Sequence, residues 1–81
     1  MNSNVVSADR ELDCRGLSCP LPIIKTKKTM DGMDTGQILK MTATDPGSIN
    51  DMAAWVTKTG NEMVHQENNE AVFTYFIRKV G

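Results

Sequence analysis

This 81-residue chain has no long apolar run, little net charge and few aromatic side chains. No stretch approaches the ~18 apolar residues that span a membrane, and the N-terminus lacks the basic start and apolar core of a signal peptide. A net charge of −1 gives no basic field for holding a nucleic acid backbone. We therefore expect no membrane association and no tight, direct binding of nucleic acid. The few aromatic residues are expected to pack in a core rather than to stack on bases: Trp55, Phe73, Tyr75 and Phe76.

Cysteine and histidine are scarce as well. The chain offers Cys14, Cys19 and His65, whereas a zinc site needs about four protein ligands, or three and a water. We expect no metal, and His65 has no evident acid–base partner. So small a chain has little room for a cofactor-sized cavity, so no cofactor is expected. Two cysteines without an export signal favour a reducing compartment, with the cytoplasm as the default, where thiols serve chemistry more often than structural bridges.

Turn signals and apolar periodicities predict one domain, residues 10–81, after a flexible N-terminus of residues 1–9. Strands are expected at residues 10–14, 37–44, 63–67 and 71–79. Helices are expected to begin at Pro20 and Pro46 and to end at Gly32 and Gly60. The asparagines of residues 68–70 tolerate positive φ and predict the turn of a hairpin.

This β-α-β-α-β-β order predicts an α/β (α+β) fold, a two-layer sandwich. A right-handed crossover places the first two strands parallel, so that both helices cover one face of a four-stranded mixed sheet. The other face is expected to be open to water, as Thr74 and Arg78 on the last strand indicate. Core filling is the expected role of the methionines on the apolar faces: Met30, Met33, Met41, Met52 and Met63.

The second helix has the strongest start signal in the chain. Asp45 can accept amide hydrogen bonds as the N-cap, and Pro46 fits the first helical position. Gly60 with Asn61 favours a left-handed exit. Between these limits runs an apolar stripe at helical spacing, with Trp55 at its edge: Ile49, Met52, Ala53 and Val56.

Cys19 lies where the first helix is expected to begin. Pro20 fits the first helical position, which makes Cys19 the N-cap, and Pro22 still falls within the first turn. Unpaired amides and the helix dipole at such a position stabilise an anion by ~0.3 to 1 kcal/mol, which lowers the pKa of a thiol by a fraction of a unit. Arg15 and Lys25 are cations close enough in sequence to add to this shift. The residues alone also allow Cys19 to be a half-buried cap without chemistry.

Three blocks of the sequence are specific in combination: LDCRGLSCPLP (residues 12–22), ATDPGSINDMAAW (residues 43–55) and TYFIRK (residues 74–79). They resemble the TusA/SirA family of small sulfur-transfer proteins, whose hallmark is Cys-Pro-x-Pro after a Leu-Asp-x-x-Gly-Leu lead-in. The similarity runs from Glu11 to Gly81. It implies the same β-α-β-α-β-β sandwich, which resembles the C-terminal domain of translation initiation factor three.

The resemblance also implies a function. Cys19 would accept a sulfane sulfur as a persulfide and pass it to a partner, with no cofactor beyond that covalent sulfur. The implied donors are a cysteine desulfurase or a rhodanese. The implied acceptors are proteins of tRNA 2-thiouridine synthesis, molybdenum cofactor assembly or cytoplasmic sulfur oxidation. Such a carrier acts only with its partners and is expected to be a monomer alone.

The candidate site consists of Cys19 as the reacting residue and of the active-site loop and helix start around it, in which Arg15 is the best candidate for a functional cation: Asp13, Cys14, Arg15, Gly16, Leu17, Ser18, Pro20 and Pro22. Residues 13–18 are expected to form a docking loop. Further cations could form a basic rim beside the thiol that docks acidic partners, with solvated surface charge as the alternative for each: Arg15, Lys25, Lys27, Lys28, Lys58, Arg78 and Lys79.

Cys14 has two interpretations. A cysteine that closes a strand is most often a small buried apolar residue. The sharper alternative is a resolving thiol that attacks the Cys19 persulfide or forms a reversible disulfide, which requires Cα atoms within about 7 Å. A redox pair of the Cys-x-x-Cys type is disfavoured, because position 22 is proline. The alternative function for the whole protein is of a different class: a non-catalytic regulatory or RNA-associated interaction module whose cysteine is incidental.

Overall fold

Six regular elements follow one another in the predicted β-α-β-α-β-β order. The computed structural model describes residues 7–18 and 20–80. Cys19, the predicted reacting residue, lies outside the described residues. Within the described part, no helix has the length and apolar character needed to cross a membrane. The elements are β1 (Arg10–Cys14), α1 (Leu21–Asp31), β2 (Ile38–Ala43), α2 (Ser48–Thr59), β3 (Glu62–Asn69) and β4 (Val72–Arg78).

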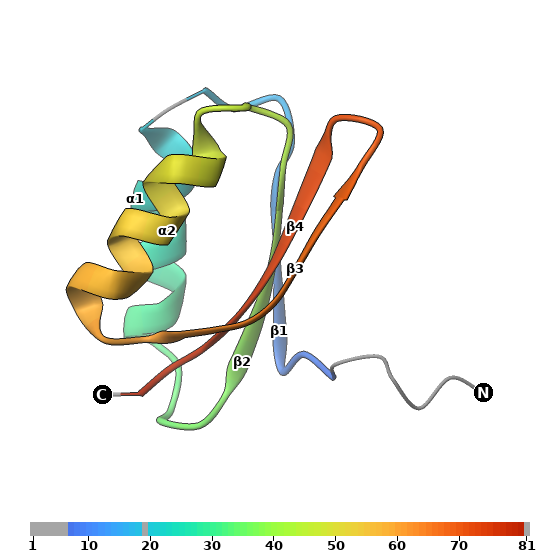
Figure 1. Ribbon diagram of the computed structural model, residues 1–81. Coiled ribbons are helices and arrows are strands. Elements are labelled where there is room, and N and C mark those ends of the chain that lie inside the picture. Colours follow the sequence, from blue (N-terminus) through green and yellow to red (C-terminus); the bar gives the residue numbers. More distant parts are fainter. Residues whose placement is uncertain (1–6, 19, 81) are drawn as a thin grey trace.

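The strands form one mixed sheet in the order β1-β2-β4-β3. β1 pairs with β2 in parallel, as predicted, and the other two pairings are antiparallel. Both helices lie on the same face of this sheet (Figure 1). The α+β two-layer fold predicted from the sequence is therefore confirmed.

β2 shows how the sequence sets the covered face. Leu39, Met41 and Ala43 are buried against the helices, while the alternate residues are half-buried on the open face. Successive side chains of a strand point to opposite faces, so this alternation fixes the register of the whole sheet.

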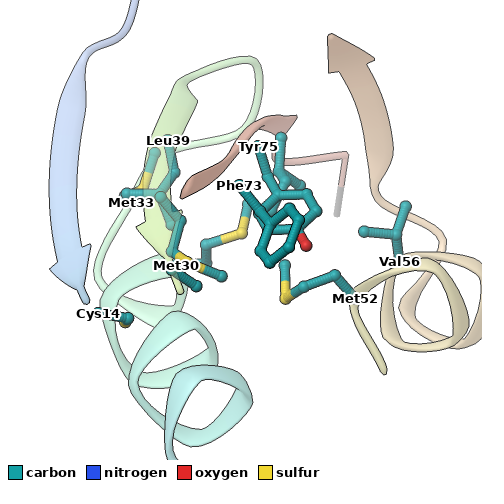
Figure 2. Packing of buried hydrophobic residues seen from close by; sticks show 11 residues of the cluster. Cys14, Met30, Met33, Leu39, Met52, Val56, Phe73 and Tyr75 are labelled. Carbon is teal, nitrogen blue, oxygen red and sulfur yellow. The ribbon is translucent and has the colours of Figure 1, made fainter. Parts of the chain in front are cut away.

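The core lies between the sheet and the helices. Figure 2 shows Met52 and Val56 of α2 facing Phe73 and Tyr75 of β4. The predicted role of the methionines in the core is confirmed, with four of them buried and the fifth packed at the edge: Met30, Met33, Met41, Met52 and Met63.

The open face of the sheet is less polar than the sequence predicted, and its side chains make more contacts with one another. Phe76 lies there and is only 6% exposed, with its ring centroid 5.7 Å from that of His65. His65 Nε2 is 3.0 Å from Glu67 Oε2. The expectation that His65 has no acid–base partner is wrong, because Glu67 lies two residues along the same strand and therefore on the same face.

The apolar stripe of α2 is rotated from the predicted one. Met52 and Val56 are buried as expected, but Ala53 is exposed and Ser48 is buried. Ser48 Oγ lies 2.8 Å from Tyr75 Oη. This buried hydrogen bond satisfies both hydroxyls and fixes the start of α2 on β4.

The hairpin turn differs from the predicted one. Asn68 and Asn69 belong to β3, and the turn consists of Glu70 and Ala71, with φ of 52° and 66°. Asn69 pairs with Val72 across this two-residue turn. The register of β4 on β2 decides the turn position, so the asparagine preference for positive φ is overridden.

Candidate functional site at the start of α1

The candidate site lies at the carboxyl ends of the two parallel strands. Cys14 and Ala43, the last residues of β1 and β2, are paired. Each strand leads through a short loop into a helix, residues 15–20 into α1 and residues 44–47 into α2. Figure 1 shows both loops at the same end of the sheet. Ligand and catalytic sites of sheets with parallel strands commonly form outside such carboxyl ends.

The helix that follows Cys19 in the sequence begins one residue later than predicted. Pro20 is the N-cap, with φ −99° and ψ 15°, and α1 starts at Leu21. The amide of Leu21 donates to the carbonyl of Ser18 at 2.9 Å, so a turn precedes the helix. Pro20 is therefore not the first helical residue, and position 19 precedes the cap. Pro22 lies within the first turn, as expected.

The start of α1 has fewer free amide donors than the sequence suggested. The first four N–H positions of a helix normally lack an intrahelical acceptor and can bind an anion. Here Pro20 and Pro22 have no N–H, and the Leu21 amide is bound to Ser18. Ile23 carries the one further N–H of this set. Stabilisation of an anion at this end therefore depends more on the helix dipole and on nearby cations.

Arg15 is held by Asp13. Its Nε and Nη2 donate to Asp13 Oδ1 and Oδ2 at 2.9 and 3.0 Å, and its backbone N–H donates to Oδ1 at 3.0 Å. The side-chain hydrogen bonds from Arg15, followed by that of its amide, lower the pKa of Asp13 to about 2. Asp13 thus compensates most of the charge that Arg15 was expected to offer to a thiolate.

Cys14 belongs to the core. It is 0% exposed, and Figure 2 shows it at the end of β1, beside α1. Burial raises the pKa of the Cys14 thiol, and the positive charge of Lys25 lowers it only in part. This favours the packing interpretation over the resolving thiol, because a resolving thiolate has to leave the core to react. The same interaction places the charge of Lys25 at this end of α1.

The loop between β1 and α1 is exposed, and a hydrogen bond from Gly16 joins it to the second loop. Arg15, Gly16 and Ser18 are exposed, while Leu17 is half-buried and packs against the core. Gly16 has φ +82°, a conformation that favours glycine. Its N–H donates to Thr44 Oγ1 at 2.9 Å. Sequence reasoning missed Thr44, which is the first residue of the second loop, and only the pairing of β1 with β2 could have indicated the contact.

Asp45 caps the second loop rather than α2 itself. The N-cap of α2 is Gly47, and the Asp45 carboxylate accepts the Gly47 amide at 3.2 Å. The carbonyl of Asp45 accepts the amide of Ser48 at 2.9 Å. Pro46 therefore lies in a turn, and the helix begins two residues later than predicted. The reason is that the Asp45 carboxylate binds the Gly47 amide within this turn, before the helix starts.

The predicted basic rim is only partly at the site. Arg78 is paired with Ile38 at the start of β2, whereas the site follows the end of that strand, about 16 Å away. Lys79 comes after Arg78. Lys28 and Lys58 lie in the last turns of α1 and α2. These four cations are therefore far from the start of α1, and the prediction of a continuous rim beside the thiol is wrong for them.

An apolar groove runs between the outer sides of α1 and α2. Ile23, Ile24 and Trp55 line it, with Lys27 and Lys58 among the residues at its border. Ile24 is 47% exposed, a large fraction for such a side chain. The groove begins in the first turn of α1, so it adjoins the candidate site.

The chain is similar to known proteins in sequence and in fold. Residues 10–79 match the family model described as sulfurtransferase TusA. The sulfur carrier protein TusA of Allochromatium vinosum is 46% identical over 88% of this chain and 93% of its own length. YrkI of Bacillus subtilis is 39% identical over 91% of this chain and 99% of its own. The crystal structure of a SirA-like protein from Desulfitobacterium hafniense has the same fold, with a TM-score of 0.76, 18% identity, and coverage of 89% of this chain and 99% of that one. The chain therefore belongs to the TusA sulfurtransferase family.

Proposed function

We propose that this protein is a sulfur carrier that receives a sulfane sulfur on Cys19 as a persulfide and relays it to a partner protein. The relative named a sulfur carrier supports the class of function. The observation that carries the assignment to Cys19 is the burial of Cys14, the other cysteine of the chain. Ser18 and Pro20, on either side of position 19, are both exposed.

The proposed reaction is an exchange between thiols and needs no oxidant. The Cys19 thiolate attacks the terminal sulfur of a donor persulfide, a new S–S bond forms on Cys19, and the S–S bond of the donor breaks. The donor cysteine leaves as a thiolate and takes up the proton that Cys19 released. Delivery is the same kind of step: a thiolate of the acceptor attacks the terminal sulfur of the Cys19 persulfide, and Cys19 leaves as the thiolate. One activated thiol and a docking surface suffice, so the chain needs no cofactor of its own.

The donor we propose is a cysteine desulfurase or a rhodanese, and the acceptor is a further sulfur-binding protein. Both steps need a reduced thiol, which fits a cytoplasmic setting. The groove between α1 and α2 is the docking surface that best fits a donor. Its apolar centre and its lysines suit a partner with an apolar side chain surrounded by carboxylates.

Mass spectrometry tests the proposal. The protein is incubated with a cysteine desulfurase and cysteine, or with a rhodanese and thiosulfate. We expect an adduct of one sulfur atom on the peptide that contains Cys19, and none in Cys19→Ser. Cys14→Ser is the matched control, and it should load as the unchanged protein does.

Two results would overturn the proposal. Absence of the adduct in both donor systems would favour an interaction module with an incidental cysteine. An adduct that survives in Cys19→Ser and disappears in Cys14→Ser would show that Cys14, and not Cys19, carries the sulfur.

A further inference from the structure

The two loops at the candidate site are joined by one side-chain hydrogen bond. Gly16 N–H donates to Thr44 Oγ1 at 2.9 Å, across 28 positions of the sequence. The bond lies just beyond the last pair of the β1–β2 ladder, Cys14 with Ala43. It therefore extends the pairing of the two strands by one step into the loops, where backbone pairing has ended.

The residue that follows Thr44 is connected to the core. The next residue, Asp45, accepts the amide of Ser48 through its carbonyl at 2.9 Å. Ser48 is 1% exposed, and its hydroxyl lies 2.8 Å from that of Tyr75. A continuous path of short contacts thus connects β4, the start of α2 and Gly16, which is three positions before Cys19.

The described residues of the loop before α1, which are residues 15–18 and 20, have few other constraints of this kind. Leu17 donates its amide to the Cys14 carbonyl at 3.2 Å, which closes a local turn within the same loop. Asp13 and Arg15 bind each other, and both are exposed. Among the described residues, the bond to Thr44 is the side-chain hydrogen bond that ties this loop to a different loop.

We propose that Thr44 is a positioning residue for sulfur transfer: by accepting the Gly16 amide, its hydroxyl holds residues 16–18 in register with the start of α1 and thereby orients the thiol of Cys19. This inference rests on the proposed function of Cys19. Thr44 takes no part in the bonds that form or break. Its effect is on the geometry of the reacting segment, to which rates of group transfer are sensitive.

The test compares variants that keep or lose the hydroxyl. Thr44→Val keeps the branched shape without the hydroxyl, and Thr44→Ser keeps the hydroxyl without the methyl. The rate of alkylation of the Cys19 peptide by iodoacetamide is measured against pH, together with the rate of sulfur loading. We expect Thr44→Val to react about three- to tenfold more slowly at neutral pH, the equivalent of one net hydrogen bond, with its pH midpoint raised. Thr44→Ser should behave as the unchanged protein.

Folding is controlled separately. Thermal unfolding shows whether each variant is folded, and Thr57→Val, on the exposed side of α2, controls for the same substitution away from the site. If valine at position 44 prevents folding, Thr44→Ser and Thr44→Ala form a second pair that differs only in the hydroxyl.

The outcomes separate the two proposals. A folded Thr44→Val with an unchanged pH profile and loading rate overturns the positioning role, and so does a failure of Thr44→Ser to restore them. If the unchanged protein does not load sulfur while Thr44→Val still shows the shifted alkylation profile, the proposed function fails. The effect of Thr44 on the reactivity of the Cys19 thiol then stands, but its role in sulfur transfer does not.

Discussion

Asp13 and Arg15 show how a single ion pair can change the electrostatics of a site. Position in the sequence suggested that Arg15 supplies positive charge to the thiol, yet its guanidinium binds both oxygens of Asp13. The carboxylate form of Asp13 is favoured by these bonds, so its pKa is lowered from 3.8 to about 2. The pair is thus complete above about pH 4 and is lost as the pH falls through about 2.

We predict that NMR titration of the Asp13 carboxyl carbon has a midpoint of about 2. Arg15→Gln should move the midpoint up toward 3.8, because the charged donor is lost. Arg10→Gln, at the other end of β1, is the control and should leave it unchanged. A midpoint near 3.8 in the unchanged protein would contradict the ion pair.

Cys14 gives a second prediction for a single residue. Because its side chain is buried and its pKa is raised by that burial, the native protein should react with thiol reagents at Cys19 at least about a hundredfold faster than at Cys14. Cys14→Ala should still load sulfur while losing about 1 kcal/mol of unfolding free energy. Peptide mass spectrometry and urea titration measure the two effects. If Cys14→Ala loads sulfur but cannot deliver it to an acceptor, the resolving-thiol interpretation is restored.

Among the elements, the β3–β4 hairpin has the least favourable local sequence. Glu70 and Ala71 both have positive φ, a conformation that two-residue turns of this kind require and that asparagine and glycine adopt most readily. The strands fix the turn at this position, because Phe73, Tyr75 and Ile77 have to face the core. Local preference and the register of the sheet therefore disagree here.

We predict that Ala71→Gly stabilises the protein by about 0.5 to 1 kcal/mol, since it removes the penalty of a side chain at positive φ. In a domain of this size, about 1 kcal/mol raises the midpoint of thermal unfolding by about 4 to 8 °C. Ala53→Gly, the same substitution at an exposed position of α2, should instead destabilise by about 1 kcal/mol. A lower midpoint for Ala71→Gly would contradict the turn.

These elements also show what the sequence could and could not predict. Strand alternation and helical stripes predicted the six elements, their order and the covered face, because these depend on apolar periodicity within each segment. The turn at Glu70 and the exposure of Ala53 depended on how the segments pair and pack, which periodicity within a segment does not contain. The late start of α2 came from the local turn that Asp45 forms with Gly47 and Ser48. At the site, the motif indicated Cys19 and its loop, but the bonds of Arg15 to Asp13 and of Gly16 to Thr44 depend on three-dimensional contacts.

At the scale of the whole molecule, the small size of the chain makes docking to a partner protein important for the proposed function. Under the proposed function, a chain of 81 residues has little room to enclose a substrate, so the partner has to orient the two reacting sulfurs. The groove between α1 and α2 combines exposed apolar surface with flanking lysines and adjoins the first turn of α1. Docking there brings the partner against the first turn of α1, the helix that follows Cys19 in the sequence.

We predict that Ile24→Glu slows sulfur loading from a donor protein by about tenfold or more, because it places a charge in the apolar centre of the groove and repels carboxylates of the partner. Alkylation of Cys19 by a small reagent should change little, since docking plays no part in that reaction. Val64→Glu introduces the same charge at an apolar position of β3, 37% exposed, and should load normally. Equal loading by Ile24→Glu and Val64→Glu would place the docking surface elsewhere, whereas a loss of reactivity with the small reagent as well would mean that Ile24→Glu damages the site itself.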